Sequence, residues 1–215
     1  LLMKLFQMKN KTQDLIGFLI VAFHLVGMVG LSTESYFSVF KSLVPYNLLI
    51  NFLLCSFYIS FQKHYKPMVL IAIIGFVIEV VGVKTGILFG EYYYGSVLGF
   101  KVLEVPLIIG LNWLLLSLAT HSIMRVFFKN RFSIICTASL LMVLLDLLIE
   151  PVAIKLGFWT WDSSFVPLQN YIMWFFSAFV MQYILIKFNS SIHYKLGLYV
   201  ISSQLFFFIY LIFNL

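Results

Sequence analysis

The sequence predicts an all-α protein, a polytopic bundle of about seven transmembrane helices. Of its 215 residues, 62% are hydrophobic and only 10% are charged, and the mean hydropathy is +1.03. Soluble domains are about half apolar and about a quarter charged. Apolar runs of about 20 residues, long enough to cross a hydrocarbon core of about 30 Å as helices, recur along the whole chain. We therefore expect a single integral membrane domain over residues 1–215, with no room for a soluble domain.

The expected helices follow the apolar runs in order. The first run begins after Lys4, Lys9 and Lys11, as a signal peptide would, but the run is long and no small-residue cleavage site follows it, so we expect a retained first helix. The expected spans are 14–31, 43–62, 67–83, 104–126, 132–151, 167–187 and 196–214.

The basic residues predict the orientation of these helices. With a cytoplasmic N-terminus, cytoplasmic segments contain ten of the 14 Lys and Arg residues, and the opposite side keeps Lys41, Lys84, Lys101 and Lys155. Because short cytoplasmic loops are enriched in Lys and Arg, we expect the N-terminus inside and the C-terminus outside, in a membrane such as the bacterial inner (cytoplasmic) membrane. The net charge of +6 is spread thinly, with no basic stripe, so we expect no nucleic-acid binding.

The cysteines and histidines indicate no metal site. Cys55 and Cys136 lie inside apolar runs without a nearby histidine cluster, so they are expected to be small buried hydrophobic residues rather than zinc ligands or a disulfide. His24, inside the first run, is expected to be packed and hydrogen-bonded. His121 and His193 are expected at the surface near the cytoplasmic side.

The eight acidic residues are informative because an ionisable group at membrane depth is by default a candidate functional group. Glu79, Asp146 and Glu150 fall in the outer half of the membrane or near its midplane. Asp146 and Glu150 are four positions apart, so they project from one helix face. Two such carboxyls in apolar surroundings cannot both ionise at low cost, and one that stays protonated can act as a general acid. The alternatives are that Glu150 faces interfacial water and that Glu79 pairs with Lys84 or a backbone donor.

Aromatic and polar residues gather at the same membrane end, in the connections 84–103 and 152–166 and at the starts of the fourth and sixth helices. An ordinary aromatic belt explains Trp and Tyr there, and contact with a substrate explains their density equally well. Glu91 is expected to be solvated unless its loop folds inward. The candidate substrate-binding residues are Glu91, Tyr92, Tyr94, Asn112, Trp113, Trp159, Trp161, Asn170 and Trp174.

The segment 82–95 contains four glycines in 14 residues, which prevent a regular helix. At membrane depth such a backbone is tolerated only where protein covers it or where it lines a cavity. A Gly/Tyr-rich re-entrant loop that caps a pocket is one interpretation, and a plain surface loop is the other. The segment lacks the Gly-Lys-Ser/Thr ending of a phosphate-binding loop.

Several motifs follow one another through the central half of the chain: EVVGVKTGILFGEYYYG (79–95), Leu98-Gly99, Val105-Pro106, Asn112-Trp113, DLLIEP (146–151), GFWTW (157–161), VPLQNY (166–171) and Trp174. Taken together, they resemble the membrane carotenoid-biosynthesis family of γ-carotene 1'-hydratases and bisanhydrobacterioruberin hydratases. The family's acidic pair is usually two aspartates, whereas Glu150 is the second acid here.

The resemblance implies addition of water to the terminal carbon–carbon double bond of an acyclic carotenoid end group, giving a tertiary alcohol. Asp146 or Glu150 would protonate the alkene, and aromatic faces would stabilise the tertiary carbocation. The partner carboxylate or Glu79 would deprotonate the incoming water. The bilayer would supply the substrate, and no metal or organic cofactor is expected.

Three other functions remain open at this stage. A carotenoid cyclase of the lycopene type begins with the same protonation, but an internal double bond captures the cation. A membrane prenyltransferase would use paired carboxylates to hold magnesium diphosphate, although no second acidic cluster lies near Asp146. A non-enzymatic carrier of a lipid or pigment would leave the clustered acids incidental. The exact carotenoid and the oligomeric state are not predicted.

Overall fold

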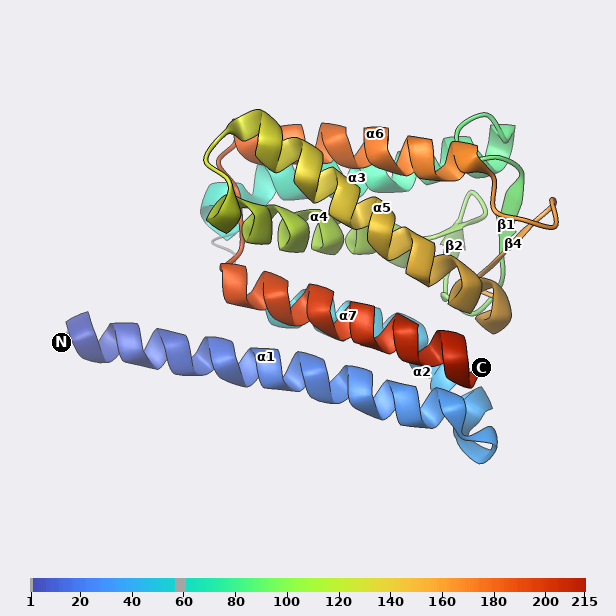
Figure 1. Cartoon of the computed structure of the whole chain (residues 1–215), viewed down its shortest axis with the longest axis horizontal. Coiled ribbons are helices and arrows are strands. Elements are labelled where there is room, and N and C mark those ends of the chain that lie inside the picture. The colour runs from blue at the N-terminus through green and yellow to red at the C-terminus, as the bar shows by residue number, and fades with distance from the viewer. Residues whose placement is uncertain (1, 57–60) are drawn as a thin grey trace.

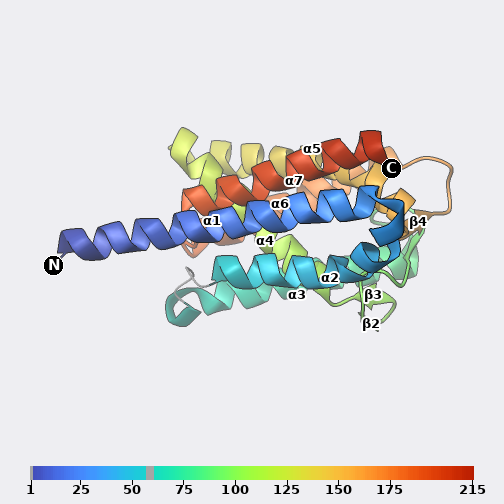
Figure 2. The same cartoon turned by 90° about the horizontal axis from the view of Figure 1, so that it is seen from below.

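Seven helices confirm the predicted fold class in the computed structural model, which describes residues 2–56 and 61–215, with side chains over 12–56 and 65–215. The helices lie alongside one another along one long axis (Figures 1 and 2). Part of the predicted second span, residues 57–60, lies outside the described residues. The helices are α1 (Leu2–Ser32), α2 (Glu34–Ser56), α3 (Phe61–Thr85), α4 (Ile108–Phe127), α5 (Arg131–Leu156), α6 (Leu168–Lys187) and α7 (Tyr194–Asn214).

Five of the helices that the structure describes are long and apolar enough to cross a membrane on their own: α1, α2, α3, α5 and α7. The protein is therefore an integral membrane protein. The other two, α4 and α6, place polar residues inside the bundle, among them Ser117 and His121 on α4 and Gln182 on α6. α4 packs against α2, α3, α5, α6 and α7, so protein rather than lipid surrounds much of it.

Four helices extend well beyond their predicted ends: α1 begins at Leu2 rather than near residue 14, α3 begins at Phe61 rather than near residue 67, and α2 and α5 are also longer. α2 begins at Glu34 rather than near residue 43, because its polar first turns continue the helix after a tight turn at Thr33. α5 continues past Pro151 to Leu156, where Gly157 ends it in the left-handed conformation at φ 69°. Glycine adopts that conformation without a Cβ clash, which is why it commonly follows a helix C-terminus.

The predicted start of the fourth helix at residue 104 is wrong. Residues before α4 form a small hairpin of β2 (Lys101–Val102) and β3 (Val105–Pro106). Its turn residues Leu103 and Glu104 have φ values of 50° and 71°, as a tight two-residue hairpin turn requires. Glu104 is therefore exposed, and it forms a 2.8 Å ion pair with Lys84.

A second small sheet joins the two long connections. β1 (Tyr92–Tyr94) pairs antiparallel with β4 (Trp159–Trp161), so that Tyr92 faces Trp161 and Tyr94 faces Trp159. The pair lies at one end of the bundle (Figure 1). Tyr92 and Tyr94 are buried, whereas Tyr93 between them is exposed, as the alternation of a strand dictates. The glycine-rich segment is thus a packed cap over the end of the bundle rather than a plain surface loop.

Close approach explains one of its glycines. Gly95 donates its N–H to the carbonyl of Phe158 at 2.8 Å, and a Cβ at Gly95 would lie 2.1 Å from the carbonyl oxygen of Gly157. Only a glycine lets the two connections cross here.

The N- and C-termini lie at opposite ends of the bundle (Figure 1), as an odd number of crossings requires. The order of the helices places the ten basic residues of the predicted cytoplasmic group at the N-terminal end. The β1–β4 sheet and the predicted acidic site lie at the other end.

Candidate active site

Glu79, near the end of α3, is the first of three buried carboxyl groups and is 4% exposed. Its Oε2 accepts hydrogen bonds from the hydroxyls of Tyr92 at 2.5 Å and Tyr94 at 2.8 Å, and its Oε1 accepts one from Nε1 of Trp113 at 2.9 Å. The carboxyl group thus ties α3 to β1 and α4. The alternative pairing with Lys84 is wrong, because Lys84 pairs with Glu104.

The two tyrosines act as neutral donors to this carboxyl group. Burial, followed by the nearby charge of Glu79, raises the pKa of both Tyr92 and Tyr94 above the ordinary value for tyrosine. Their hydroxyls therefore keep their protons at neutral pH and remain available as hydrogen-bond donors.

Asp146 and Glu150 are the other two buried carboxyl groups, at 0% and 2% exposure. They lie on one face of α5 and share a donor: Nδ2 of Asn170 is 2.8 Å from Oδ2 of Asp146 and 3.4 Å from Oε1 of Glu150. Oε2 of Glu150 also accepts hydrogen bonds from Nε1 of Trp159 at 3.0 Å and of Trp161 at 2.9 Å. The alternative in which Glu150 faces interfacial water is therefore wrong.

The donors are unevenly divided between these two carboxyl groups. Oδ1 of Asp146 has no hydrogen-bond partner among the residues that the structure describes, whereas both oxygens of Glu150 accept bonds. Buried polar atoms are nearly always paired. The unpaired oxygen therefore marks Asp146 as the carboxyl with the least support for a negative charge.

Paired, tilted aromatic rings lie beside Glu79 and Glu150. Trp113 of α4 and Trp174 of α6 lie with ring centroids 4.1 Å apart, and Tyr92 and Trp161 of the small sheet lie 5.0 Å apart. Since the faces of aromatic rings carry partial negative charge, these walls can stabilise a cation without providing a nucleophile.

A cavity of about 20 Å³ lies between the carboxyl groups of Glu79 and Glu150. A single water needs roughly 10–15 Å³ of such space and two to four polar partners. The cavity therefore has the size for one water molecule. Its lining consists of Glu79, Phe89, Tyr92, Tyr94, Glu150, Trp159, Trp161, Asn170 and Trp174.

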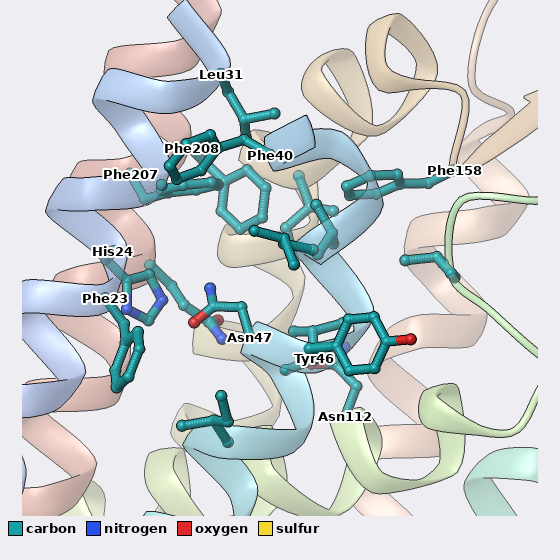
Figure 3. Close-up of a pocket in the computed structure, with 18 of the residues that line it drawn as sticks. Phe23, His24, Leu31, Phe40, Tyr46, Asn47, Asn112, Phe158, Phe207 and Phe208 are labelled. Atoms are coloured by element: carbon teal, nitrogen blue, oxygen red, sulfur yellow. The ribbon is translucent and has the colours of Figure 1, made fainter. Parts of the chain in front are cut away.

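A second, apolar pocket of about 320 Å³ lies beside this group, mainly between α1, α2, α4 and α7 (Figure 3). Trp159 lines both the pocket and the small cavity. Asn112, predicted as a substrate contact, lines the apolar pocket instead of the acidic cavity. The other lining residues of this pocket were not predicted, although Asn47 and Gln204, polar residues inside apolar runs, were a usable signal.

The profile of the family described as "Carotenoid biosynthesis protein" matches residues 43–214, which contain every residue of the acidic cavity. The chain belongs to the carotenoid biosynthesis protein family. A relative from Haloarcula japonica named bisanhydrobacterioruberin hydratase is 34% identical over 112 residues, covering 48% of this chain and 38% of the relative. No solved structure matches the chain.

In this carotenoid biosynthesis protein, the predicted substrate contact Glu91 also lies outside the acidic cavity, and His121 differs from its predicted surface position. Glu91 is exposed, as expected, and lines an open hollow with Tyr93 and Asp162. His121 is not a surface residue: it is fully buried, and its Nδ1 lies 2.8 Å from Oε1 of Gln182. The prediction was wrong because His121 is close in sequence to the cytoplasmic loop, but α4 and α6 pack together there and bury its side chain.

The other histidines and the cysteines follow the predictions in part. His24 is buried, and its Nδ1 lies 2.8 Å from the carbonyl oxygen of Ile20, as expected for a packed histidine. His193 is half-buried and caps α7. Cys55 is buried and Cys136 half-buried, and both are free. Among the described residues, no group of three or more His, Cys, Asp or Glu side chains could hold a metal ion.

Proposed function

We propose that the protein is a carotenoid hydratase that adds water across the terminal carbon–carbon double bond of an acyclic carotenoid end group and so forms a tertiary alcohol. The observation that carries this proposal is the water-sized cavity of about 20 Å³ between Glu79 and Glu150, with aromatic walls and Asp146 one helical turn away. Membership of a carotenoid biosynthesis family and the relative named as a hydratase support it.

In the first step, Asp146 or Glu150 transfers a proton to the less substituted carbon of the terminal alkene. A new C–H bond forms, the π bond breaks, and the positive charge remains on the tertiary carbon. Asp146 is the better candidate for the donor, because its carboxyl accepts a bond from Asn170 alone among the described residues. A carboxyl with few donors gains least from being ionised.

The aromatic walls then stabilise the tertiary cation. An aromatic face beside a desolvated cation contributes about 2 kcal/mol. The candidates are Tyr92, Tyr94, Trp113, Trp159, Trp161 and Trp174.

Water completes the reaction. A water molecule in the small cavity attacks the tertiary carbon, and as the C–O bond forms a carboxylate accepts the released proton. Glu79 and Glu150 both line that cavity, so either can serve. Proton transfer back to the acid restores the starting state, and the net change is the addition of one water, with no oxidant or cofactor consumed.

The membrane placement forms part of the proposal. With the N-terminus cytoplasmic and the C-terminus outside, as in a bacterial inner membrane, the acidic cavity lies toward the outer surface. The carotenoid reaches it from the bilayer.

Oxygen tracing tests the reaction. Purified protein with lycopene in detergent or lipid, incubated in ¹⁸O-labelled water, should yield a tertiary alcohol that carries one ¹⁸O. A chelator should leave the rate unchanged, and no nucleotide, reductant or O₂ should be needed. An isomer of unchanged mass would indicate a cyclase, a requirement for a diphosphate donor and a divalent metal would indicate a prenyltransferase, and unchanged lycopene would indicate a carrier.

A further inference from the structure

The apolar pocket opens sideways, on the surface that faces lipid. Its α1 and α2 walls include Phe23, Val26, Leu43 and Tyr46, all of them exposed, with Tyr46 the most exposed at 61%. In Figure 3, Phe23 and His24 project from α1 on one side of the pocket, and Phe158 lies on the other. A lipid-soluble molecule could therefore enter between α1 and α2 without crossing water.

The part of α2 that lines the pocket is only partly buried. α2 is described in full, and its buried residues are Asn51, Cys55 and Ser56, all at the end away from the β1–β4 sheet. The part that lines the pocket, residues 40–50, contributes no buried residue. Its half-buried residues Phe40, Val44 and Leu48 pack against the core, while its other side stays exposed.

The wall chemistry suits a hydrocarbon. Most of the lining is aliphatic or phenylalanine. His24 is bonded to the carbonyl of Ile20 through Nδ1, and Asn47 accepts a 2.9 Å bond from Asn51 through Oδ1, so both use these polar atoms within their own helices. Such a wall can pack against methyl groups and conjugated carbons, whereas a charged headgroup would find no ion-pair partner among its lining residues.

The inner end of the pocket reaches the acidic cavity. Ile149 and Asn112 line the pocket and are chain neighbours of Glu150 and Trp113, and Trp159 lines both spaces. An apolar chain in the pocket would therefore end against the residue that donates to Glu150.

We infer that this lateral pocket binds the terminal isoprenoid segment of the polyene, which enters from the bilayer between α1 and α2 and brings its end group to Trp159. The inference rests on the proposed function, since it supplies that reaction with its substrate. A volume of about 320 Å³ is at the lower end of the range of ~300–1,000 Å³ for small-molecule pockets. The pocket therefore holds one end of the chain, and the rest of the polyene stays in the lipid.

Two matched pairs of substitutions on α2 test the inference. Val44→Trp and Leu48→Trp put a large side chain into the pocket, because both residues line it. Val39→Trp and Leu49→Trp make the same chemical change on the exposed side of the same helix, where the residues are 55% and 38% exposed and do not line the pocket. Each variant is purified from a lycopene-producing host, and its monodispersity and retained lycopene are measured. The same comparison in the Glu150→Gln background keeps the bound pigment unreacted.

We expect Val44→Trp and Leu48→Trp to retain about tenfold less lycopene than the parent and to raise KM for lycopene by a similar factor, while Val39→Trp and Leu49→Trp match the parent. Equal retention in all four monodisperse variants would overturn the inference, even if a labelled alcohol forms. If one of the two pocket variants fails to fold, the other still tests whether the pocket binds lycopene. If the pocket variants lose lycopene and the parent protein never forms an alcohol, the lateral pocket is supported as a binding site and the hydratase proposal is overturned.

Discussion

The indole N–H of Trp159 donates a 3.0 Å hydrogen bond to Oε2 of Glu150, and Trp159 also lines the lateral apolar pocket. One side chain thus contacts both an acid and the space that we assign to the hydrocarbon. Trp161 donates to the same oxygen at 2.9 Å but lines the acidic cavity and not the lateral pocket. Both tryptophans therefore donate a hydrogen bond to Glu150, but only Trp159 also lines the space that we assign to the hydrocarbon.

Trp159→Phe and Trp161→Phe should separate these two roles. Each removes one donor from Glu150, and a hydrogen bond to a charged group contributes about 1.5–3 kcal/mol, so each should lower kcat by roughly 10–100-fold. Trp159→Phe should also change KM for lycopene, because its ring forms part of the pocket wall. Steady-state kinetics on both variants measure this. Identical KM values in the two variants would contradict the shared-wall role of Trp159.

Amide substitutions test the acid pair. Asp146→Asn and Glu150→Gln keep the side-chain shape but lose the transferable proton, so each should reduce turnover by about 10²–10⁴-fold, the usual contribution of a general acid or base. Product is measured by chromatography, and folding by monodispersity in detergent. Asp162→Asn, an exposed acid at the same end of the bundle, is the matched control and should keep full activity. If both amide variants still form the labelled alcohol at the parental rate, the hydratase proposal stands and the acid assignment fails.

Local periodicity was enough to predict the number of helices and the acid pair. Asp146 and Glu150 are four positions apart, so a helix alone places them on one face. The approach of Glu79 to that pair depends on which helices pack together, and helical periodicity carries no such information. The common membrane depth of the three acids was predictable, while the cavity that Glu79 and Glu150 share was not.

Non-local contacts account for what the sequence analysis missed. The β1–β4 sheet joins residues 92–94 to residues 159–161, and strands of three residues give too short an alternating pattern to stand out among tyrosines and tryptophans. The lateral pocket is lined largely by Leu, Val, Ile and Phe, which in a membrane protein are equally common on lipid-facing surfaces. His121 was misplaced for a related reason, since hydropathy gives depth along a helix but not which side faces the protein.

The three tyrosines of β1 provide an internal comparison for stability. Tyr92→Phe and Tyr94→Phe each remove a hydroxyl donor from the buried carboxyl of Glu79, and an unsatisfied buried group costs about 1–3 kcal/mol. Tyr93→Phe removes a hydroxyl from the exposed side of the same strand and should be neutral. We expect a lower thermal-unfolding temperature in detergent for the first two variants. If Tyr93→Phe lowers the unfolding temperature equally, the loss of stability comes from changing the strand and not from losing the hydrogen bonds to Glu79.

Glu79→Gln extends the same comparison to the acceptor. The amide would place its NH₂ group either against the indole N–H of Trp113, which can only donate, or against the hydroxyls of Tyr92 and Tyr94, which would then have to accept instead of donating. We therefore expect lower stability together with reduced turnover. Restored stability in the triple variant Glu79→Gln, Tyr92→Phe and Tyr94→Phe, without restored turnover, would indicate that Glu79 also acts in the reaction. Full activity of the single variant would assign proton acceptance to Glu150.

Reporter fusions test the orientation that follows from the ten basic residues at the N-terminal end of the bundle. Reporters joined after Lys11 and Lys129 should lie in the cytoplasm. Reporters joined after Lys101 and Leu215 should lie on the opposite side, because three helices precede Lys101 and seven precede Leu215. Alkaline phosphatase and green fluorescent protein report opposite sides and control for expression. If the reporter after Leu215 is cytoplasmic and the reporter after Lys101 is external, the four helices α4–α7 cross the membrane an odd number of times. One of the two less apolar helices, α4 or α6, would then not span the membrane. A cytoplasmic reporter at both Lys101 and Leu215, with external ones at Lys11 and Lys129, would invert the protein and place the acidic cavity toward the cytoplasm.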